Sequence, residues 1–334
     1  MGASFAKFVH IGAKLDKLPI GAIFLFIFAY GFVESRLMKR KILFVYNPIS
    51  GSRRIIPVLP IIERFTNREL YDYSIISTNH KGHATELARE YADKKYDAVI
   101  AVGGDGTVNE VGCGLIGTDT AMGIIPCGSG NGLARHLGIP MDPYKAVKWL
   151  DKSKFTSIDY GTINGHPFFC TCGVGFDATV SDSFSKSRTR GVLTYMENIL
   201  LKIATYKDQL YKLSFDNSSE TFESFIVTCA NADQWGNNAF IAPTASMQDG
   251  LMDVVVIHPF TPLDAPLLAF QLFNRQLDKN EKVTIRKCKR LTITREEEGP
   301  AHFDGDPILL GKEIDIEMIP RGLNVLIPDK RRGI

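Results

Sequence analysis

The spacing of apolar residues changes about half-way along this chain. From Lys41 to about Lys154, short apolar runs alternate with stretches whose apolar residues recur at helical spacing. The strands expected there are 41–46, 96–102 and 122–126, and the expected helices are 55–68, 84–94, 109–116, 131–137 and 143–150. Strands that alternate with helices are typical of an α/β sheet domain.

Beyond Ser157 the pattern becomes one of short alternating strands. They are expected at 157–163, 168–173, 210–215, 221–230, 252–258, 282–285, 290–294 and 313–318, and a last strand at 323–328 is expected to return to the first domain. This texture predicts an antiparallel β-rich domain. An interrupting helix carries a stripe of Leu193, Met196, Ile199, Leu200 and Ile203, which we expect to pack in the core, with a lipid-facing gate as the alternative. The expected division is therefore 1–37 as an extension, 38–156 with 319–330 as the α/β domain, and 157–318 as the β-rich domain.

Three strands of the first region end in loops of small polar residues. The run 103–110 reads Gly-Gly-Asp-Gly-Thr-Val-Asn-Glu, and the other two loops are 47–51 and 127–132. Glycines at such positions let backbone N–H groups close on phosphate oxygens, and strand ends in an open α/β sheet share one edge. No glycine precedes Lys-Ser or Lys-Thr as a Walker A loop requires, and Asn109 stands where a dinucleotide fingerprint needs its third glycine. The sequence predicts a nucleotide-phosphate site of another kind.

Together these motifs resemble the diacylglycerol kinase catalytic family, which includes sphingosine, ceramide and bacterial lipid kinases. The resemblance runs from about Lys41 to Pro328 and is carried by 47–51 (N-P-x-S-G), 103–110 (G-G-D-G-T-x-N-E), 128–131 (G-[ST]-x-N), 241–243 with 249–253, and 304–306 at the family's D-G-E position. It implies an α/β nucleotide-binding domain of the NAD kinase and diacylglycerol kinase type. It also implies a β-rich, sandwich-like C-terminal domain, with the active site in the cleft between the two.

The resemblance implies transfer of the γ-phosphoryl group of ATP to a lipid hydroxyl with Mg²⁺, and diacylglycerol is the expected acceptor. The ATP-binding residues implied are Asn47, Pro48, Ser50, Gly51, Thr78, Gly104, Asp105, Gly106, Thr107, Asn109, Glu110 and Ser129. A sphingoid base or ceramide kinase is the first alternative. A soluble-metabolite kinase of the NAD kinase type and an inactive lipid-binding module are the others.

The base that accepts the lipid hydroxyl's proton maps to Asp306. Family members usually carry glutamate there, so this chain places its carboxylate one methylene closer to the backbone. Asp304 or Asp105 could share the catalytic work. Without the other motifs, Asp304-Gly305 reads as a type I′ hairpin turn.

Asp105 is also the expected metal ligand, because a carboxylate at a phosphate site repels the ligand unless a cation intervenes. Ser246, Asp249 and Leu251 match a second cation site of bacterial members, and an Asp-Gly turn is the alternative. Asp177 is a candidate substrate contact, or else a cap or turn aspartate.

His80 and His83 lie near Thr78. They are interpreted as surface or capping residues, because no third metal ligand is recognised beside them in the sequence.

Composition narrows the partners. With 39 basic and 37 acidic residues, the net charge of +2 gives no field that would favour nucleic acid. The basic clusters 286–290 and 330–332 are either solvated faces or contacts to an anionic membrane. Six scattered cysteines indicate reduced thiols in a cytoplasmic protein.

The N-terminal run 19–33 is apolar but short for a membrane span. It is either an interfacial anchor or an extension foreign to the natural protein, with Met38 as the native start. The expected location is cytoplasmic, at the inner face of the membrane, with transient contact to its surface. ATP and a membrane lipid are the expected partners, nucleic acid is not, and a homodimer is a further expectation.

Overall fold

The computed structural model of the chain describes residues 39–48, 57–186 and 206–328. Several expectations lie outside these residues. They are the N-terminal extension 1–37, Ser50 and Gly51 of the first loop, and the apolar stripe between 193 and 203.

Strands and helices follow one another in the order that the sequence pattern predicts, with some additions. The strands are β1 (Arg40–Tyr46), β2 (Tyr71–Ser77), β3 (Ala98–Gly103), β4 (Ala121–Pro126), β5 (Lys154–Ile163), β6 (His166–Phe168), β7 (Thr171–Gly175), β8 (Gln209–Phe215), β9 (Ser219–Ser224), β10 (Ile226–Ala230), β11 (Met252–Ile257), β12 (Val283–Cys288), β13 (Arg290–Arg295), β14 (Gly299–Phe303), β15 (Asp306–Leu310) and β16 (Glu313–Ile327). The helices are α3 (Val58–Phe65), α4 (His83–Asp93), α5 (Asp105–Leu115), α6 (Gly132–His136), α7 (Pro143–Trp149), α8 (Phe176–Lys186) and α10 (Ala265–Phe273), with short 3₁₀ turns at Leu150–Lys152 and Leu277–Lys279.

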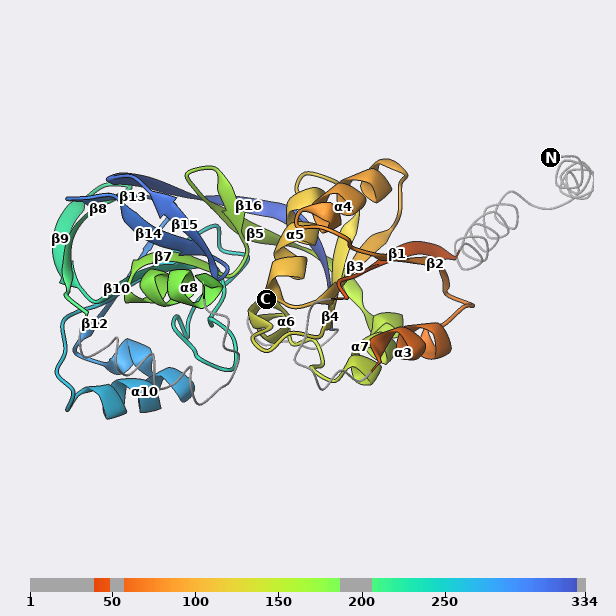
Figure 1. Cartoon of the computed structure of the whole chain (residues 1–334), viewed down its shortest axis with the longest axis horizontal. Coiled ribbons are helices and arrows are strands. Elements are labelled where there is room, and N and C mark those ends of the chain that lie inside the picture. The colour runs from red at the N-terminus through yellow and green to blue at the C-terminus, as the bar shows by residue number, and fades with distance from the viewer. Residues whose placement is uncertain (1–38, 49–56, 187–205, 329–334) are drawn as a thin grey trace, which may run out of the picture.

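One long sheet runs through both halves of the molecule (Figure 1). Its order among the described residues is β2-β1-β3-β4-β16-β13-β8-β9, and β5 and β6 branch from β16. The pairs from β2 to β4 are parallel, as is the contact between β4 and β16, whereas the later pairs are antiparallel. The α/β half of Figure 1 thus continues directly into the β-rich half.

The parallel strands β1, β3 and β4 are buried on both faces, because helices cover each face of the sheet there. Leu43 and Val45 of β1 pack with α4 and α5, whereas Ile42 and Phe44 on the other face pack with α3 and α7. Successive side chains of a strand point to opposite faces, so a run that is apolar throughout serves two cores. This explains why the expected strands of the first half read as continuous apolar runs.

Strand β16 links the two halves. It pairs with β13 at its beginning and meets β4 at Val325, opposite Met122. The two strands expected at 313–318 and 323–328 are therefore one strand, with an irregularity between Ile319 and Leu323 in its register with β5. The end of β16 therefore lies beside β4 of the first sheet region.

The second sheet has the order β12-β11-β10-β7-β14-β15 among the described residues. Its inner face packs against the antiparallel part of the long sheet, through residues such as Val227 and Val254 on one side and Ile293 and Ile316 on the other. The outer face packs with α8 and α10. Two layers that enclose one apolar core form the sandwich-like arrangement that the sequence predicts, and the predicted fold class is confirmed.

Three features escape the sequence pattern. Strand β2 is only half buried and mixes polar with apolar residues, so it lacks a clear strand signal. The strands β14 and β15 on either side of the Asp304-Gly305 turn are not among the expected strands. Helix α10 carries apolar residues on its buried and exposed sides, so it has no amphipathic stripe.

The six cysteines, all in described segments, form no disulfide. None of the helices in the described ranges is long and apolar enough to cross a membrane.

Candidate active site

The loops after β1, β3 and β4 lie side by side, as the sequence predicts. The backbone N–H of Asn47 donates to the Val102 carbonyl over 3.1 Å, and that of Cys127 donates to Gly103 over 2.8 Å. These bonds extend the parallel ladder to the last residue of each strand. The side chain of Asn47 then reaches across and donates through Nδ2 to Thr107 Oγ1 over 3.1 Å.

Glycines allow the second and third loops to touch through their backbones. A Cβ added to Gly128 would lie 2.6 Å from the Cα of Gly104, which no side chain can accommodate without moving one of the loops. A Cβ on Gly106, by contrast, would meet nothing within 4 Å. Because Gly106 lies in the first turn of α5, the free backbone N–H groups there border open space and can accept an anion.

Asp105 clasps the third loop. Its two carboxylate oxygens accept the backbone N–H groups of Asn131 and Gly132, each over 2.8 Å. Asn131 is in the left-handed conformation with φ 52°, and its side chain closes the loop by bonding Gly128 in both directions. A carboxylate oxygen has two lone pairs, so each oxygen of Asp105 keeps one acceptor position.

Glu110 lies one and a half turns after Asp105 on α5 and holds the turn before α4. Its carboxylate accepts the backbone N–H groups of Gly82 and Ala84 over 2.9 and 3.2 Å, and Thr85 Oγ1 donates to its carbonyl. Thr78 lies just before this turn, anchored by its N–H to Tyr46. Glu110 thus holds the start of α4 beside the three loops. Ser129 is exposed at the tip of the third loop.

Asp304 forms the junction between α5 and the second sheet. It accepts four hydrogen bonds, from the backbone N–H groups of Phe169, Cys170 and Thr171 over 2.7 to 3.1 Å and from Asn109 Nδ2 over 2.9 Å. Burial raises the pKa of the Asp304 carboxyl, and these bonds oppose only part of that rise. A carboxylate with two donors on each oxygen is already fully occupied.

The orientation of Asn109 is fixed by Cys113, one turn further along α5. Burial raises the pKa of the Cys113 thiol to about 12, so the thiol is neutral and donates to Asn109 Oδ1. The amide nitrogen therefore faces Asp304 rather than the oxygen.

Asp306 follows Asp304 across a two-residue hairpin. Asp304 and Gly305 have φ values of 46° and 86°, which is the type I′ geometry, and Phe303 pairs with Asp306. The side chain of Asp306 is 48% exposed and lies 3.4 Å from Lys81 Nζ, in the turn before α4. The type I′ turn predicted for Asp304-Gly305 is therefore compatible with a role for Asp306 in the site. The hairpin that Asp304 anchors directs Asp306 toward the turn that Glu110 holds.

Asp177 begins α8 and is largely enclosed. Its Oδ2 accepts from Thr228 Oγ1 over 2.8 Å and lies 3.0 Å from Nε2 of His302, and its Oδ1 accepts the N–H of Ala178. These contacts join α8 to β10 and to β14, the strand that leads to Asp304. The structure therefore gives Asp177 a bracing contact, and its role as a substrate ligand stays a prediction.

The second expected cation site contains a lysine. Asp249 accepts the N–H of Leu251 over 3.1 Å and pairs with Lys287 Nζ over 2.8 Å, and Ser246 Oγ accepts the N–H of Gln248. Gly250 has a φ of 72°, so the alternative, an Asp-Gly turn, describes the backbone. The charge that faces Asp249 is an ammonium group, and the metal role of Ser246, Asp249 and Leu251 stays a prediction.

Comparison with known proteins identifies the family. Residues 41–163 match the diacylglycerol kinase catalytic domain, and residues 170–327 match the YegS C-terminal NAD kinase beta sandwich-like domain. Residues 41–163 belong to the diacylglycerol kinase catalytic domain family.

Relatives of this kinase are similar over most of its length. It is 29% identical to a probable lipid kinase YegS-like of Chromohalobacter salexigens over 68% of this chain and 75% of that protein. It is 28% identical to a diacylglycerol kinase of Bacillus subtilis over 86% of this chain and 96% of the relative. A crystal structure of a putative diacylglycerol kinase from Bacillus anthracis has the same fold, with a TM-score of 0.67 and 24% identity, over 87% of this chain and 98% of the other.

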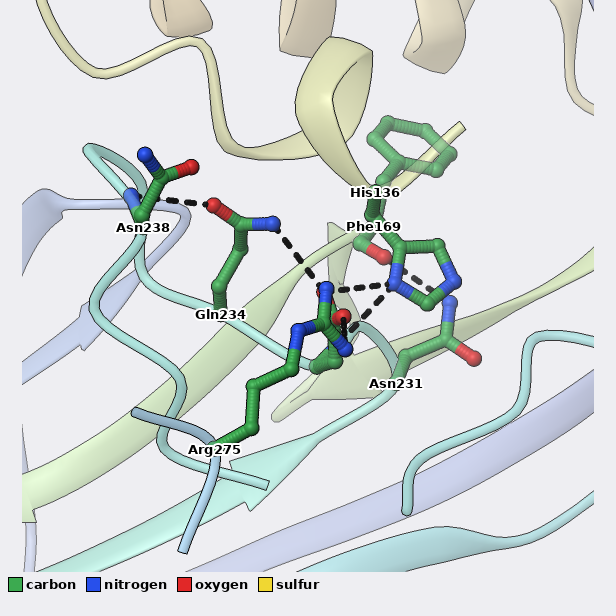
Figure 2. A network of polar contacts seen from close by, with 7 residues as sticks. His136, Phe169, Asn231, Gln234, Asn238 and Arg275 are labelled. Atoms are coloured by element: carbon green, nitrogen blue, oxygen red, sulfur yellow. Dashed lines mark hydrogen bonds and ion pairs between the residues drawn. The ribbon is translucent and has the colours of Figure 1, made fainter. Parts of the chain in front are cut away.

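A polar network joins α6, the helix after the kinase's third loop, to the β-rich half. It was not predicted from the sequence. Figure 2 shows His136, Gln234 and Arg275 converging from separate segments. His136 Nδ1 lies 2.8 Å from an oxygen of Asp233, whose other oxygen is 2.8 Å from Arg275 Nη1. Because a carboxylate only accepts, the imidazole nitrogen donates to it.

Three further hydrogen bonds accompany these contacts. Gln234 Nε2 donates to Asp233, and Asn231 Nδ2 donates to the carbonyl of Asp159 and to that of Phe169, the second of which is drawn in Figure 2. A polar run directly after an apolar strand, 231–238, is the signal in the sequence that could have pointed to this network.

The ion pair of Asp233 predicts a dependence of stability on pH. Burial alone would raise the pKa of the Asp233 carboxyl, but the hydrogen bond and charge of His136 and the charge of Arg275 hold it below its usual value. A carboxyl whose folded pKa lies below its unfolded value of about 3.9 stabilises the fold fully above that value, and the contribution is lost as the pH falls below about 4. We expect Asp233→Asn to lower the free energy of unfolding at pH 7 by about 1–3 kcal/mol, and the difference from wild type to shrink below pH 4.

Urea unfolding at pH 7 and pH 3.5 measures this difference. Asp72→Asn, at an exposed position of β2, serves as the control and should show little difference at either pH. A difference for Asp233→Asn that stays constant down to pH 3.5 would show that the charge of Asp233 does not contribute.

Proposed function

We propose that this kinase transfers the γ-phosphoryl group of ATP to the hydroxyl of a membrane lipid, most simply diacylglycerol, with Mg²⁺. The observation that carries the proposal is that α5, which begins at the glycine-rich loop, contacts both the hairpin that bears Asp306 and the turn that faces Asp306. Asp304 fixes the hairpin to α5, and Asp306 faces the Lys81 turn that α5 holds through Glu110. One helix therefore positions both the phosphate-binding end and the carboxylate that we assign as the base.

The nucleotide is expected to bind at the strand ends. The first-turn N–H groups of α5 around Gly106 would receive phosphate oxygens, with Asn47 and Thr107 forming one side of the site and the third loop the other. Pro48 ends the described part of the first loop. Thr78 and Ser129 are assigned as further contacts, and Glu110 and Asn109 as residues that position the site.

Mg²⁺ fits the residues present. Hard cations take oxygen ligands, and each oxygen of Asp105 keeps an acceptor position beside the loop that would hold the phosphates. Bound there, the ion would neutralise charge on the phosphates, which favours their approach to a nucleophile.

The Asp306 carboxylate is assigned as the acceptor of the proton from the lipid hydroxyl. Asp306 accepts the proton of the lipid hydroxyl as the hydroxyl oxygen forms a bond to the γ-phosphorus, and the bond from that phosphorus to the bridging oxygen of ADP breaks. The half-exposed side chain of Asp306 leaves it accessible to a substrate, whereas both oxygens of the partly buried Asp304 already accept two hydrogen bonds each. We therefore assign Asp304 as a positioning residue and Asp306 as the base.

A lipid acceptor requires a surface that meets the membrane, and α10 with the residue just before it carries the largest group of exposed apolar side chains in the described residues. Leu263 is 91% exposed just before the helix, and Leu267, Phe270 and Phe273 are 55 to 59% exposed along one of its faces. Residues spaced by three or four lie on one side of a helix. Leu268, on the opposite side, packs with the outer core of the second sheet, so α10 is fixed to the domain that carries Asp306.

The double variant Leu267→Glu/Phe270→Glu tests this surface. Burial of one Leu or Phe side chain contributes about 1.5–3 kcal/mol, so we expect about tenfold or greater loss of binding to phosphatidylglycerol vesicles that contain diacylglycerol, measured by co-sedimentation. Leu210→Glu is the control, because that side chain is 54% exposed on β8 and should not change binding. Equal binding by wild type and the double variant would exclude α10 as the membrane contact.

The acceptor is identified by offering the purified protein a panel of lipids with labelled ATP and Mg²⁺. Diacylglycerol, phosphatidylglycerol, sphingosine, ceramide and undecaprenol are compared with NAD as a soluble acceptor. We expect label in phosphatidic acid. Labelled sphingosine or ceramide would show that the acceptor is a sphingolipid and not diacylglycerol. Labelled NAD alone, or no labelled product from folded protein that binds ATP, would overturn the proposal of a lipid acceptor.

A further inference from the structure

His80, His83 and Glu86 meet at the start of α4. Each offers one ligand atom, and these atoms all lie within 4.8 Å of one another. His80 belongs to the turn before the helix, His83 is its first residue, and Glu86 follows one turn later on the same face. The sequence interpretation of the two histidines is therefore incomplete, because the third ligand continues their three-residue spacing.

The ring nitrogens of His80 are arranged as in a metal ligand. Its Nδ1 lies 3.0 Å from the carbonyl oxygen of Lys81, and because a carbonyl only accepts, Nδ1 carries the proton of the neutral ring. Its Nε2 therefore presents a free lone pair, and it lies 3.8 Å from Glu86 Oε2. A metal-binding histidine usually donates its other N–H to a carbonyl or carboxylate in this way.

His83 lies against this pair. Its ring stacks on that of His80, with centroids 4.7 Å apart and an angle of 24° between the planes. Its Nδ1 accepts the backbone N–H of Asn79 over 3.3 Å, a long bond that an ion at this nitrogen would replace. The side chains of His80 and Glu86 are 52% and 67% exposed, so the ligands can close the remaining distance without disturbing the core.

We propose that His80, His83 and Glu86 bind a divalent transition-metal ion, with Zn²⁺ as the best match. Two imidazoles and one carboxylate suit Zn²⁺ and its first-row neighbours, and three protein ligands leave a position for water. Mg²⁺ prefers oxygen ligands, so this site differs in chemistry from the one assigned to Asp105. The proposal depends on these three side chains and not on the proposed kinase reaction.

The site borders the candidate active site through one residue. Lys81 lies between the two histidines in the sequence and contacts Asp306, and Glu110 holds the adjacent Gly82. An ion bound to residues on both sides of Lys81 would restrict the turn that carries it. The structure thus links metal binding to the position of the ammonium group that faces Asp306.

Zinc binding is measured on the full chain after chelator treatment, by titration with ZnCl₂ in competition with a chromophoric zinc chelator. We expect one competing site, and His80→Ala and Glu86→Gln should each weaken its affinity by about tenfold or more, because each removes a ligand. The matched control is His166→Ala, an exposed histidine on β6, which should bind as wild type does. Both test positions are partly exposed, and circular dichroism establishes that each variant is folded.

Two results would overturn the proposal. One is the absence of competition by the wild-type chain. The other is zinc affinity that His80→Ala and Glu86→Gln leave unchanged, which would assign the ion to cysteines or other histidines. Neither result bears on phosphorylation of the lipid panel with Mg²⁺, so failure here is distinguishable from failure of the proposed function.

Discussion

Replacement of Asp306 by asparagine is expected to lower turnover of the lipid substrate by roughly 10²–10⁴-fold, which is the usual contribution of a positioned general base. Asparagine preserves the size of the side chain and the hairpin turn, but its amide cannot accept the hydroxyl proton. Because Asp306 contacts Lys81 and not the glycine-rich loops in the described residues, affinity for ATP should change little. Initial rates at saturating lipid, together with a nucleotide-binding titration, measure the two effects separately.

Asp306→Glu provides the matched variant. It restores the family's usual residue and keeps a carboxylate, so substantial activity is expected, and Asp278→Asn at an exposed position should behave as wild type. If Asp306→Asn turned over the lipid at close to the wild-type rate, the role of proton acceptor would have to be assigned to another group. Asp304 would be a poor substitute, because its four bonds already occupy both oxygens.

The loops of this site could be predicted from the sequence because their signal is local. A buried strand followed by Gly103, Gly104 and Gly106 permits few structures, and the contact between Gly104 and Gly128 is one that only glycines allow. The same holds for the Asp304-Gly305 turn, whose residue types favour positive φ. Position along the chain was therefore enough to place these loops together at one edge of the sheet.

The roles of the acidic residues could not be predicted in this way. Asp105, Glu110 and Asp304 all accept bonds from backbone N–H groups, which any residue except proline supplies, so no residue pattern marks the partner. The partners are also far away along the chain, because Asn131 is 26 positions from Asp105 and Cys170 is 134 positions from Asp304. Asp105 and Asp304, which the motifs suggest as catalytic, thus hold the third loop and the β14–β15 hairpin in place.

His136 and Asp233 illustrate a second limit. Their pairing brings a short helix after the third loop against a segment that follows β10, a distance of 97 residues along the chain. Each residue alone reads as an ordinary polar position. Only the fold shows that the helix after the third loop is joined to the β-rich half through a buried contact between His136 and Asp233.

Asp105→Asn is expected to lower kcat/KM for ATP by roughly 10²-fold, because the asparagine turns one acceptor into an N–H₂ group that faces the backbone N–H of Asn131 or Gly132. A buried donor left without an acceptor costs about 1–3 kcal/mol, and each 1.4 kcal/mol is about tenfold in an equilibrium or a rate. The third loop should move away from the phosphates as a result. ATP titrations of the initial rate measure this loss, and Asp119→Asn, an exposed aspartate beyond α5, is the control.

The same variant separates the two roles of Asp105. If Asp105 also holds Mg²⁺, the variant should need more Mg²⁺ for half-maximal rate at saturating ATP, because one of the ion's carboxylate oxygens is lost. A Mg²⁺ requirement equal to that of wild type, with the loss in kcat/KM for ATP intact, would confine Asp105 to the loop clasp and contradict its assignment as a metal ligand. Thermal unfolding of the variant is the control for stability. A displaced loop should leave the two apolar cores intact, so an unchanged melting temperature would show that the loss of rate arises in the site.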